Sequence, residues 1–67
     1  MDYAGAYETL LNFRHLLVDE NLENIKKDYI QFSSHEIGNS FYKLVEEGYI
    51  EIKKVNGRSP VILKVLK

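Results

Sequence analysis

Apolar residues recur at helical spacing through the segment SSHEIGNSFYKLVEEGYI, residues 33–50. The stripe that they form along one side of an α-helix consists of Ile37, Phe41, Leu44 and Val45. Ser33 and Glu36 form a capping box at the start, since each side chain can satisfy a free backbone N–H of the first turn. Gly48 supplies a stop at the other end. The pattern therefore predicts a helix over about residues 34–47.

After this helix the spacing changes from helical to alternating. Residues 49–55 alternate as a half-buried β-strand does, and a second apolar strand follows over residues 61–66. Asn56-Gly57 lies between them and is the strongest short-range signal for a two-residue hairpin loop. We therefore predict a β-hairpin over about residues 49–66.

The dipeptide loop sets a register for this hairpin. The positions predicted to face inward are Ile50, Ile52, Val61 and Leu63. Those predicted to face outward are Tyr49, Glu51, Lys53, Ile62 and Lys64. The register also brings Pro60 opposite Lys53, and proline cannot donate to the ladder. Either the second strand lies at the sheet edge, or the loop is longer than two residues.

Residues 3–18 predict a first helix, on which apolar side chains form two adjoining stripes. One stripe consists of Ala6, Leu10, Phe13 and Leu17. The other consists of Tyr7, Leu11 and Val18, with Arg14 between the two.

Two interpretations of the second stripe are equally open. An apolar arc wider than the roughly 100° of a surface helix indicates a further partner, and the simplest partner is a second copy of the chain. Alternatively, both stripes pack within one chain, because a small core uses its helices fully. The first interpretation predicts a homodimer through the first helix, with an interface at Tyr7, Leu11, Arg14 and Val18.

A short second helix is predicted over about residues 22–30, where Leu22, Ile25 and Tyr29 recur at helical spacing. Asp19 or Asn21 can cap its start. Helix, short helix, turn and helix in this order form a helix-turn-helix. Together with the hairpin, they predict one α+β domain of three helices followed by two strands.

Length and composition agree with one small globular domain, since the chain has 67 residues, of which 45% are apolar and 28% are charged. No apolar run approaches the roughly 20 residues that cross a bilayer, and no signal-peptide pattern is present. The absence of cysteine excludes disulfides and thiolate metal sites. We therefore expect a cytoplasmic protein that does not enter a membrane.

The net charge of −1 is unevenly distributed. Residues 1–31 contain six acidic and three basic side chains, whereas residues 32–67 contain four acidic and six basic ones. Such asymmetry indicates that a polyanion meets only one end of the molecule.

The sequence contains no pattern typical of an enzyme. His15 and His35 lie on separate predicted elements, and the four glycines are scattered. No nucleophile arrangement, zinc spacing or phosphate-binding loop is therefore indicated. We expect no catalysis, no cofactor and no small-molecule ligand.

The polar face of the helix at 34–47 suits a double-stranded DNA partner. Its candidate contacts are Ser34, His35, Asn39, Tyr42 and Lys43. Asn39 can bond an adenine edge, and the others can reach bases or phosphates. The hairpin adds Lys53, Lys54 and Arg58, which can displace counterions from phosphates. An ordinary alternative exists for each group, because polar residues cover any exposed helix and strand lysines prevent edge-to-edge aggregation.

Gly38 is unexpected inside this helix, where glycine costs about 1 kcal/mol relative to alanine. It lies at the flank of the apolar stripe and can permit close contact with the second helix or with DNA.

The order of capped helix, glycine and hairpin resembles the winged-helix family of DNA-binding domains. Residues 41–50, FYKLVEEGYI, are similar to the end of the third helix in small prokaryotic and archaeal transcription regulators. The resemblance covers about residues 22–66, and the composition resembles regulators of archaea, their viruses or plasmids. It implies that the third helix reads the major groove, that the wing touches the flanking backbone or minor groove, and that a dimer binds a two-fold site.

The third helix departs from this family in having no arginine and in carrying Glu36 and Glu46, which repel phosphate when exposed. The alternative function is a winged-helix protein–protein interaction module in a larger assembly. DNA binding requires one continuous basic surface, formed by Asn39, Lys43, Lys53, Lys54 and Arg58. Interruption of this surface by Glu46 and Glu51 would favour the interaction module.

Overall fold

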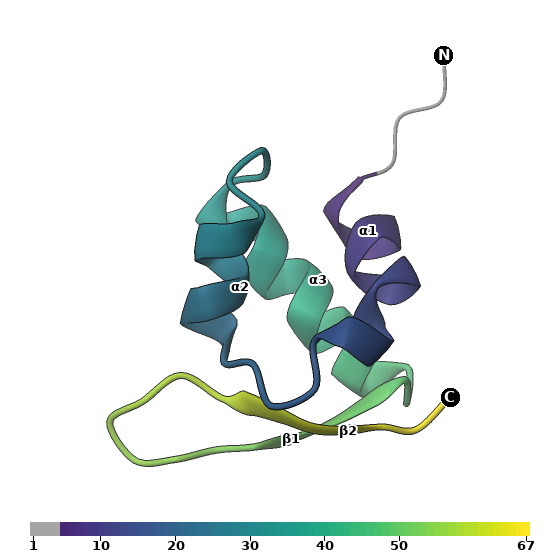
Figure 1. Cartoon of the computed structure of the whole chain (residues 1–67), viewed down its shortest axis with the longest axis vertical. Coiled ribbons are helices and arrows are strands. Elements are labelled where there is room, and N and C mark those ends of the chain that lie inside the picture. The colour runs from purple at the N-terminus through teal and green to yellow at the C-terminus, as the bar shows by residue number, and fades with distance from the viewer. Residues whose placement is uncertain (1–4) are drawn as a thin grey trace.

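A computed structural model describes residues 5–67, and in this range three α-helices precede an antiparallel two-stranded hairpin (Figure 1). The elements are α1 Ala6–Asn12, the 3-10 turn η1 Arg14–Leu16, α2 Leu22–Asp28, α3 Ser34–Glu46, β1 Ile50–Lys53 and β2 Val61–Val65. This is the predicted α+β class, and the order is compatible with a winged-helix arrangement. The first residues of the predicted first helix, 3 and 4, lie outside the described residues. No helix in the described range is long and apolar enough to cross a membrane.

The predicted caps of α3 are confirmed. The Glu36 backbone N–H donates to Ser33 Oγ at 3.1 Å, and the Ser33 N–H donates to Glu36 Oε1 at 2.9 Å. At the other end, Gly48 has a φ of +79°. This conformation directs the Gly48 N–H to the Val45 carbonyl at 3.1 Å and the next N–H, of Tyr49, to the helix at 2.9 Å. Both ends of the 13-residue helix are therefore fixed by local hydrogen bonds.

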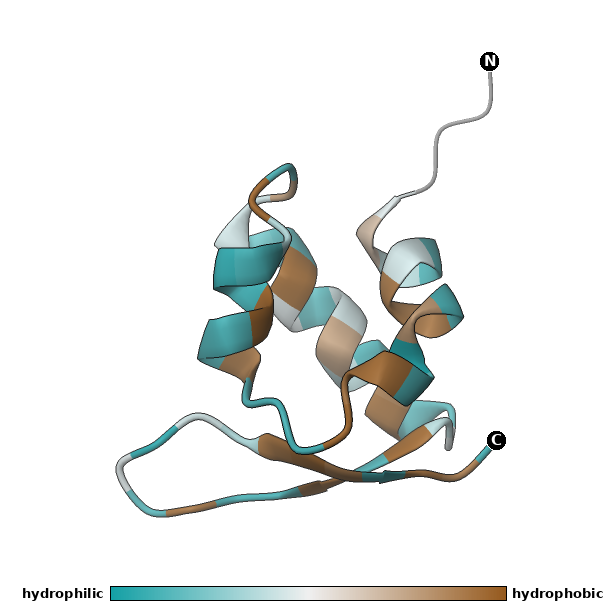
Figure 2. Ribbon diagram, viewed as in Figure 1, coloured by the Kyte–Doolittle hydropathy of each residue, from teal (hydrophilic) through white to brown (hydrophobic). Residues whose placement is uncertain are grey.

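One stripe of α3 forms the centre of the core. Ile37, Phe41 and Leu44 are each at most 1% exposed. The other buried apolar residues are Ala6, Leu10, Leu17, Leu22, Ile25, Phe32, Ile50 and Ile62. They come from both other helices and both strands, except Leu17 and Phe32, which lie in the connecting segments. The apolar sides of α2 and α3 face each other in Figure 2. α3 therefore lies between α1 and α2, with the hairpin at its end (Figure 1).

The first helix is shorter than predicted, because the chain tightens after Asn12. The Leu16 N–H donates to the Phe13 carbonyl at 2.9 Å, and the Leu17 N–H donates to the Arg14 carbonyl at 3.1 Å. These are bonds between residues three apart, as in a 3-10 helix, and they change the direction of the following side chains. The prediction for Phe13 is consequently wrong: it is 45% exposed, whereas Leu17 is buried.

The second helix begins as predicted and ends earlier. The Asn24 backbone N–H donates to Asn21 Oδ1 at 2.8 Å, so Asn21 is the cap and Asp19 is not. The helix ends at Asp28 rather than near residue 30.

The hairpin loop is longer than the Asn56-Gly57 dipeptide. Lys53 pairs with Val61, so the connection covers residues 54–60. The Arg58 N–H donates to the Val55 carbonyl at 3.0 Å. Gly57 has a positive φ and Asn56 does not, which indicates a type II turn rather than the type I′ turn of a two-residue hairpin.

The predicted facing of the second strand is also wrong. Ile52 pairs with Ile62 and Glu51 with Lys64, so Leu63 is an extra residue in a β-bulge. Ile62 is 1% exposed and faces the core, whereas Leu63 is 46% exposed. The longer loop shifts the register by one residue, and the bulge shifts it again.

The segment between η1 and α2 pairs with the other edge of β2. The Asp19 N–H donates to the Ile62 carbonyl at 2.8 Å, and the Ile62 N–H donates to the Glu20 carbonyl at 3.1 Å. Asp19 and Glu20 together oppose Ile62, which makes a β-bulge. Asp19, the first residue of this bulge, has a φ of +72°, a conformation that favours glycine. This unpredicted contact ties the start of α2 to the hairpin.

Gly38 lies within α3 and Gly48 lies just after its end, and we expect alanine to have opposite effects on stability at these two positions. We expect Gly48→Ala to lower the free energy of unfolding by about 1–2 kcal/mol, because a Cβ is strained at a positive φ. We expect Gly38→Ala to raise it by about 1 kcal/mol, since an added Cβ meets nothing within 4 Å and alanine favours helix. Urea unfolding followed by circular dichroism measures both. Destabilisation by Gly38→Ala would show that the glycine has a packing role.

Candidate nucleic-acid interface

All eight residues predicted to contact DNA are exposed. Five lie on α3, namely Ser34, His35, Asn39, Tyr42 and Lys43. Three lie at or beside the hairpin loop, namely Lys53, Lys54 and Arg58. The structure therefore leaves both groups accessible, on two different elements.

The side of α3 opposite the core presents a polar outward stripe, which we define as His35, Asn39, Tyr42 and Glu46. Their i, i+4, i+7, i+11 spacing places them one above another along the helix. Tyr42 is 41% exposed, and its ring lies edge-on against Phe41 with 5.4 Å between centroids. Within residues 5–67, no hydrogen bond engages the side chain of His35, Asn39 or Tyr42. The stripe thus offers donors and acceptors to an external partner.

Lys43 lies on the α1 side of the helix rather than on the outward stripe. Its Nζ is 4.8 Å from the centroid of the Tyr7 ring, a cation–π geometry. The Tyr7 hydroxyl in turn donates a hydrogen bond to the Glu47 carboxylate. Lys43 therefore contacts α1, next to the Tyr7–Glu47 hydrogen bond.

The contact between Tyr7 and Glu47 affects the ionisation of the phenol. The hydrogen bond to the carboxylate, assisted by desolvation and by the negative charge of Glu47, raises the pKa of Tyr7 from 10.0 to about 12. A carboxylate that accepts from the hydroxyl favours its neutral form. The neutral phenol therefore links α1 to α3.

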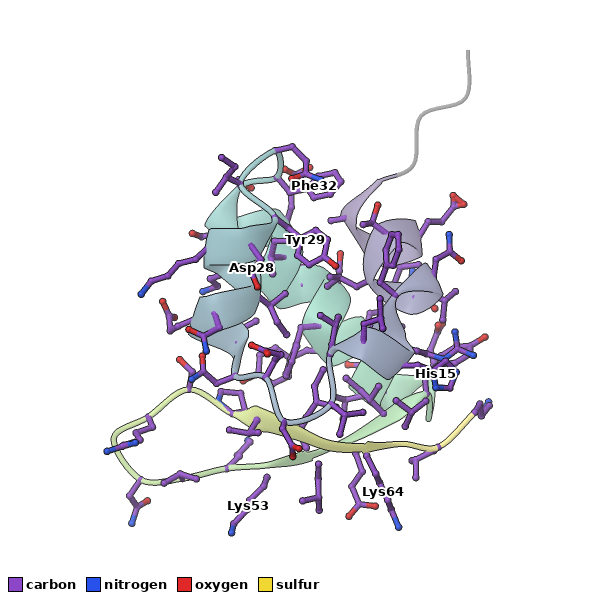
Figure 3. All side chains as sticks on the ribbon, viewed as in Figure 1. His15, Asp28, Tyr29, Phe32, Lys53 and Lys64 are labelled. Carbon is purple, nitrogen blue, oxygen red and sulfur yellow. The ribbon has the colours of Figure 1, made fainter. Side chains whose placement is uncertain are left out.

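Three exposed basic side chains lie together at the far end of the hairpin, and we define Lys53, Lys54 and Arg58 as the basic tip. Figure 3 shows Lys53 pointing away from the helices. The nearest acid on the hairpin, Glu51, is paired with Lys64 at 3.8 Å. The tip consequently has positive charge without a neighbouring carboxylate on its own strands.

The start of α2 lies against the base of the hairpin loop. Ser59 Oγ donates to Glu23 Oε2 at 3.3 Å, and the Leu22 N–H donates to the Pro60 carbonyl at 2.9 Å. One turn further along α2, Lys27 is exposed and Lys26 lies 3.6 Å from Glu23 Oε2. The sequence prediction omitted these two lysines, although two consecutive bases on a predicted helix beside the turn were a visible signal.

The positive charge does not form one continuous surface. The basic tip and the lysines of α2 lie on one side of α3, whereas Lys43 lies on the side of α1, and Figure 1 shows α1 and α2 flanking α3. Glu46 is also exposed, on the outward stripe. Glu36 lies off this stripe, and its carboxylate is engaged by the capping box.

The residues predicted to form a homodimer interface mostly have partners in the same chain. Leu11 is half-buried against the core, and Tyr7 is bonded to Glu47. Arg14 Nε donates to the Lys67 carbonyl at 2.7 Å, and its guanidinium lies 5.4 Å from the Tyr49 ring centroid. Val18 is 37% exposed. The second stripe of the first helix is therefore used largely within the chain.

No protein-family model, curated protein or solved structure matches this chain. Residues 5–67 enclose no pocket, and in that range no cluster of three or more His, Asp or Glu side chains is placed to hold a metal ion.

The Tyr7 contact predicts a dependence of stability on alkaline pH. The folded-state pKa is raised, so the stabilisation is complete below about pH 10 and is lost as the pH rises through about 12. We expect the unfolding free energy of the wild type to fall more steeply over this range than that of Tyr7→Phe. Tyr42→Phe is the matched control, because its hydroxyl is on the outward stripe. Parallel profiles for the wild type and Tyr7→Phe would contradict the assigned bond.

Proposed function

We propose that this chain is a winged-helix domain that binds double-stranded DNA and regulates transcription. The observation that carries the proposal is the outward stripe: polar side chains with no internal partner run along a helix whose other side is buried in the core. An α-helix with its side chains is about 10–12 Å across, and the major groove is about 12 Å wide, so α3 can lie in the groove. The exposed basic tip supports the proposal by offering charge for phosphates.

The distribution of charge along α3 favours one orientation in the groove. The first half carries His35 and Asn39, at the end of the helix where the backbone dipole is positive. Glu46 in the last turn and Glu47 at the C-cap are acidic and would repel phosphate. We therefore infer that the first half of α3 enters the groove and that the last turn stays away from the backbone, an approach common in helix-turn-helix proteins.

Each candidate side chain then has a distinct chemical role. The Asn39 side-chain amide can donate its N–H to adenine N7 and accept from the adenine N6 amino group, in a bidentate pair. His35 can bond a base edge or a phosphate. Tyr42 lies about two helical turns after His35, and its hydroxyl can donate to a phosphate. Lys54 and Arg58 on the loop can reach the flanking backbone or the minor groove, where they displace counterions.

The competing function is a winged-helix module that binds another protein in a larger assembly. Two observations favour it: Lys43 is separated from the basic tip, and Glu46 lies on the outward stripe. Such a partner would contact the stripe without strong dependence on salt, because it would not need to release counterions from phosphates.

Salt titration of binding to a pool of short random duplexes, followed by sequencing of the bound fraction, separates the two functions. With three to five basic side chains on phosphates, we expect log affinity to fall with log salt with a slope of roughly −3 to −5. We also expect one sequence motif to be enriched. Absence of binding at low salt would refute the DNA proposal and favour the protein-interaction module.

Substitutions distinguish contacts to phosphate from contacts to bases. We expect Lys53→Ala combined with Arg58→Ala to weaken binding to every duplex and to reduce the salt slope by about two. Asn39→Ala should instead change the preferred sequence. Lys64→Ala with Lys67→Ala removes the same charge towards the other end of the hairpin and should have a smaller effect. An equal loss on all duplexes from Asn39→Ala would remove its role in base recognition.

A further inference from the structure

The side chain of Asn56 has no structural role in the turn that contains it. The loop covers residues 54–60, so Asn56 and Gly57 do not form a two-residue hairpin loop. Asparagine is favoured in a type I′ turn because it tolerates a positive φ, but here only Gly57 has one, at +74°. Within residues 5–67, the Asn56 side chain makes no hydrogen bond. Its amide is therefore free to react.

Gly57, the next residue, presents an unprotected backbone N–H beside this amide. Among the residues that the structure describes, it has no hydrogen-bond acceptor. A Cβ placed on Gly57 would have no atom within 4 Å, and residues 53–58 are all exposed. The turn is closed by the bond from the Arg58 N–H to the Val55 carbonyl, at 3.0 Å. Opening this bond lets the Gly57 nitrogen approach the Asn56 side chain.

The four other asparagines are each followed by a backbone N–H that is already bonded. The residues after them are Phe13, Leu22, Ile25 and Ser40. The first three donate to backbone carbonyls at 2.9–3.1 Å, and Ser40 lies within the hydrogen-bonded turns of α3. All four also carry a side chain that crowds the nitrogen, whereas glycine has none. Asn56 therefore differs from the other asparagines in two independent ways.

We propose that Asn56 is a site of spontaneous deamidation. Hydroxide removes the Gly57 N–H proton, the nitrogen attacks Asn56 Cγ, and the Cγ–Nδ2 bond breaks. The departing nitrogen takes a proton from water and leaves as ammonia, so a cyclic succinimide remains. Water then opens the ring at either carbonyl. Cleavage between the nitrogen and Cγ gives aspartate, and cleavage between the nitrogen and the backbone carbonyl carbon gives isoaspartate.

The basic tip favours this reaction and is altered by it. Lys54 and Arg58 each lie two residues from Asn56 along the chain, and positive charge stabilises the amide anion that attacks. The product places a carboxylate among the three bases of the tip, at the end of the hairpin far from the C-terminus (Figure 1). Its negative charge offsets one of theirs and weakens attraction for a polyanion. This consequence rests on the proposed DNA binding, whereas the reaction itself does not.

Mass spectrometry of the folded chain after incubation in mildly alkaline buffer tests the reaction. We expect the wild type to gain the mass that replacement of NH by O supplies, faster as the pH rises. Peptide mapping should place the change at Asn56, in two products of equal mass that chromatography separates. Asn56→Gln should lack them, because glutamine needs a larger ring.

Gly57→Ala tests the route through the glycine nitrogen. We expect it to slow the reaction roughly tenfold, because a Cβ hinders the attack. Gly38→Ala is the matched control: it makes the same substitution within α3 and should leave the rate at Asn56 unchanged. Circular dichroism establishes that each variant is folded.

Three results would overturn the proposed reaction. The wild type could keep its mass throughout the incubation. Another asparagine could react faster than Asn56. Gly57→Ala could react as fast as the wild type, which would exclude attack by an unhindered glycine nitrogen.

Binding to duplexes tests the consequence separately. Asn56→Asp introduces the product charge, and we expect it to lower affinity about threefold, the size of an exposed charge interaction. Unchanged affinity would overturn the assigned effect on the basic tip. If the unmodified chain binds no duplex, the proposed function fails, while the mass measurement still decides whether Asn56 reacts.

Discussion

Burial of one apolar stripe of α3 holds residues 5–67 together, because both other helices and both strands contribute to the same core around it. The cap at Ser33 and the glycine at position 48 fix where this helix starts and stops. A helix residue advances by 100°, so fixing the buried positions Ile37, Phe41 and Leu44 also fixes which residues face outward. The outward stripe is therefore a consequence of the core. The same packing that stabilises this small domain positions the side chains proposed to read DNA.

The positions of the carboxylates explain how a chain with net charge −1 can present a basic tip. Glu36 bonds the backbone of its cap, Glu47 accepts from Tyr7, and Glu51 pairs with Lys64. An exposed ion pair such as Glu51–Lys64 contributes little stability, typically about 0–1 kcal/mol. Lys64 offsets the charge of Glu51, whereas Glu36 and Glu47 stay charged but lie at the two ends of α3, away from the basic tip. Affinity for a polyanion depends on such local charge more than on the total.

Sequence patterns predicted the parts of the fold that depend on local chemistry. The bounds of α3, both of its caps, the start of α2 and the existence of the hairpin follow from short-range signals and are confirmed. The register of β2 could not be predicted, because Val61, Ile62 and Leu63 are all apolar and alternation does not distinguish which of them faces the core. The exposure of Phe13 was missed for a similar reason, since a continuous helix and a helix ending in a 3-10 turn have the same residues at that point.

For the candidate site, too, some features could be predicted from the sequence and others could not. Exposure of its eight residues could be predicted, because polar positions opposite a buried stripe must face water. The position of Lys43 could not, since its side chain follows the Tyr7 ring on a different element. The contact between α2 and the hairpin loop could not be predicted either, because it depends on hydrogen bonds between residues 19–22 and residues 60–62. Contacts between segments far apart in sequence decided each of these.

The pairing on both edges of β2 also bears on how the hairpin could act. A two-stranded hairpin alone is marginally stable in water. Here β1 holds one edge of β2, and the Asp19 and Leu22 N–H groups hold the other at Ile62 and Pro60, close to the loop. The base of the loop is thus tied to the start of α2, which packs on α3. Because this anchoring precedes any binding, Lys54 and Arg58 start from a fixed base beside α2. The contact proposed between the loop and a phosphate would therefore cost less entropy.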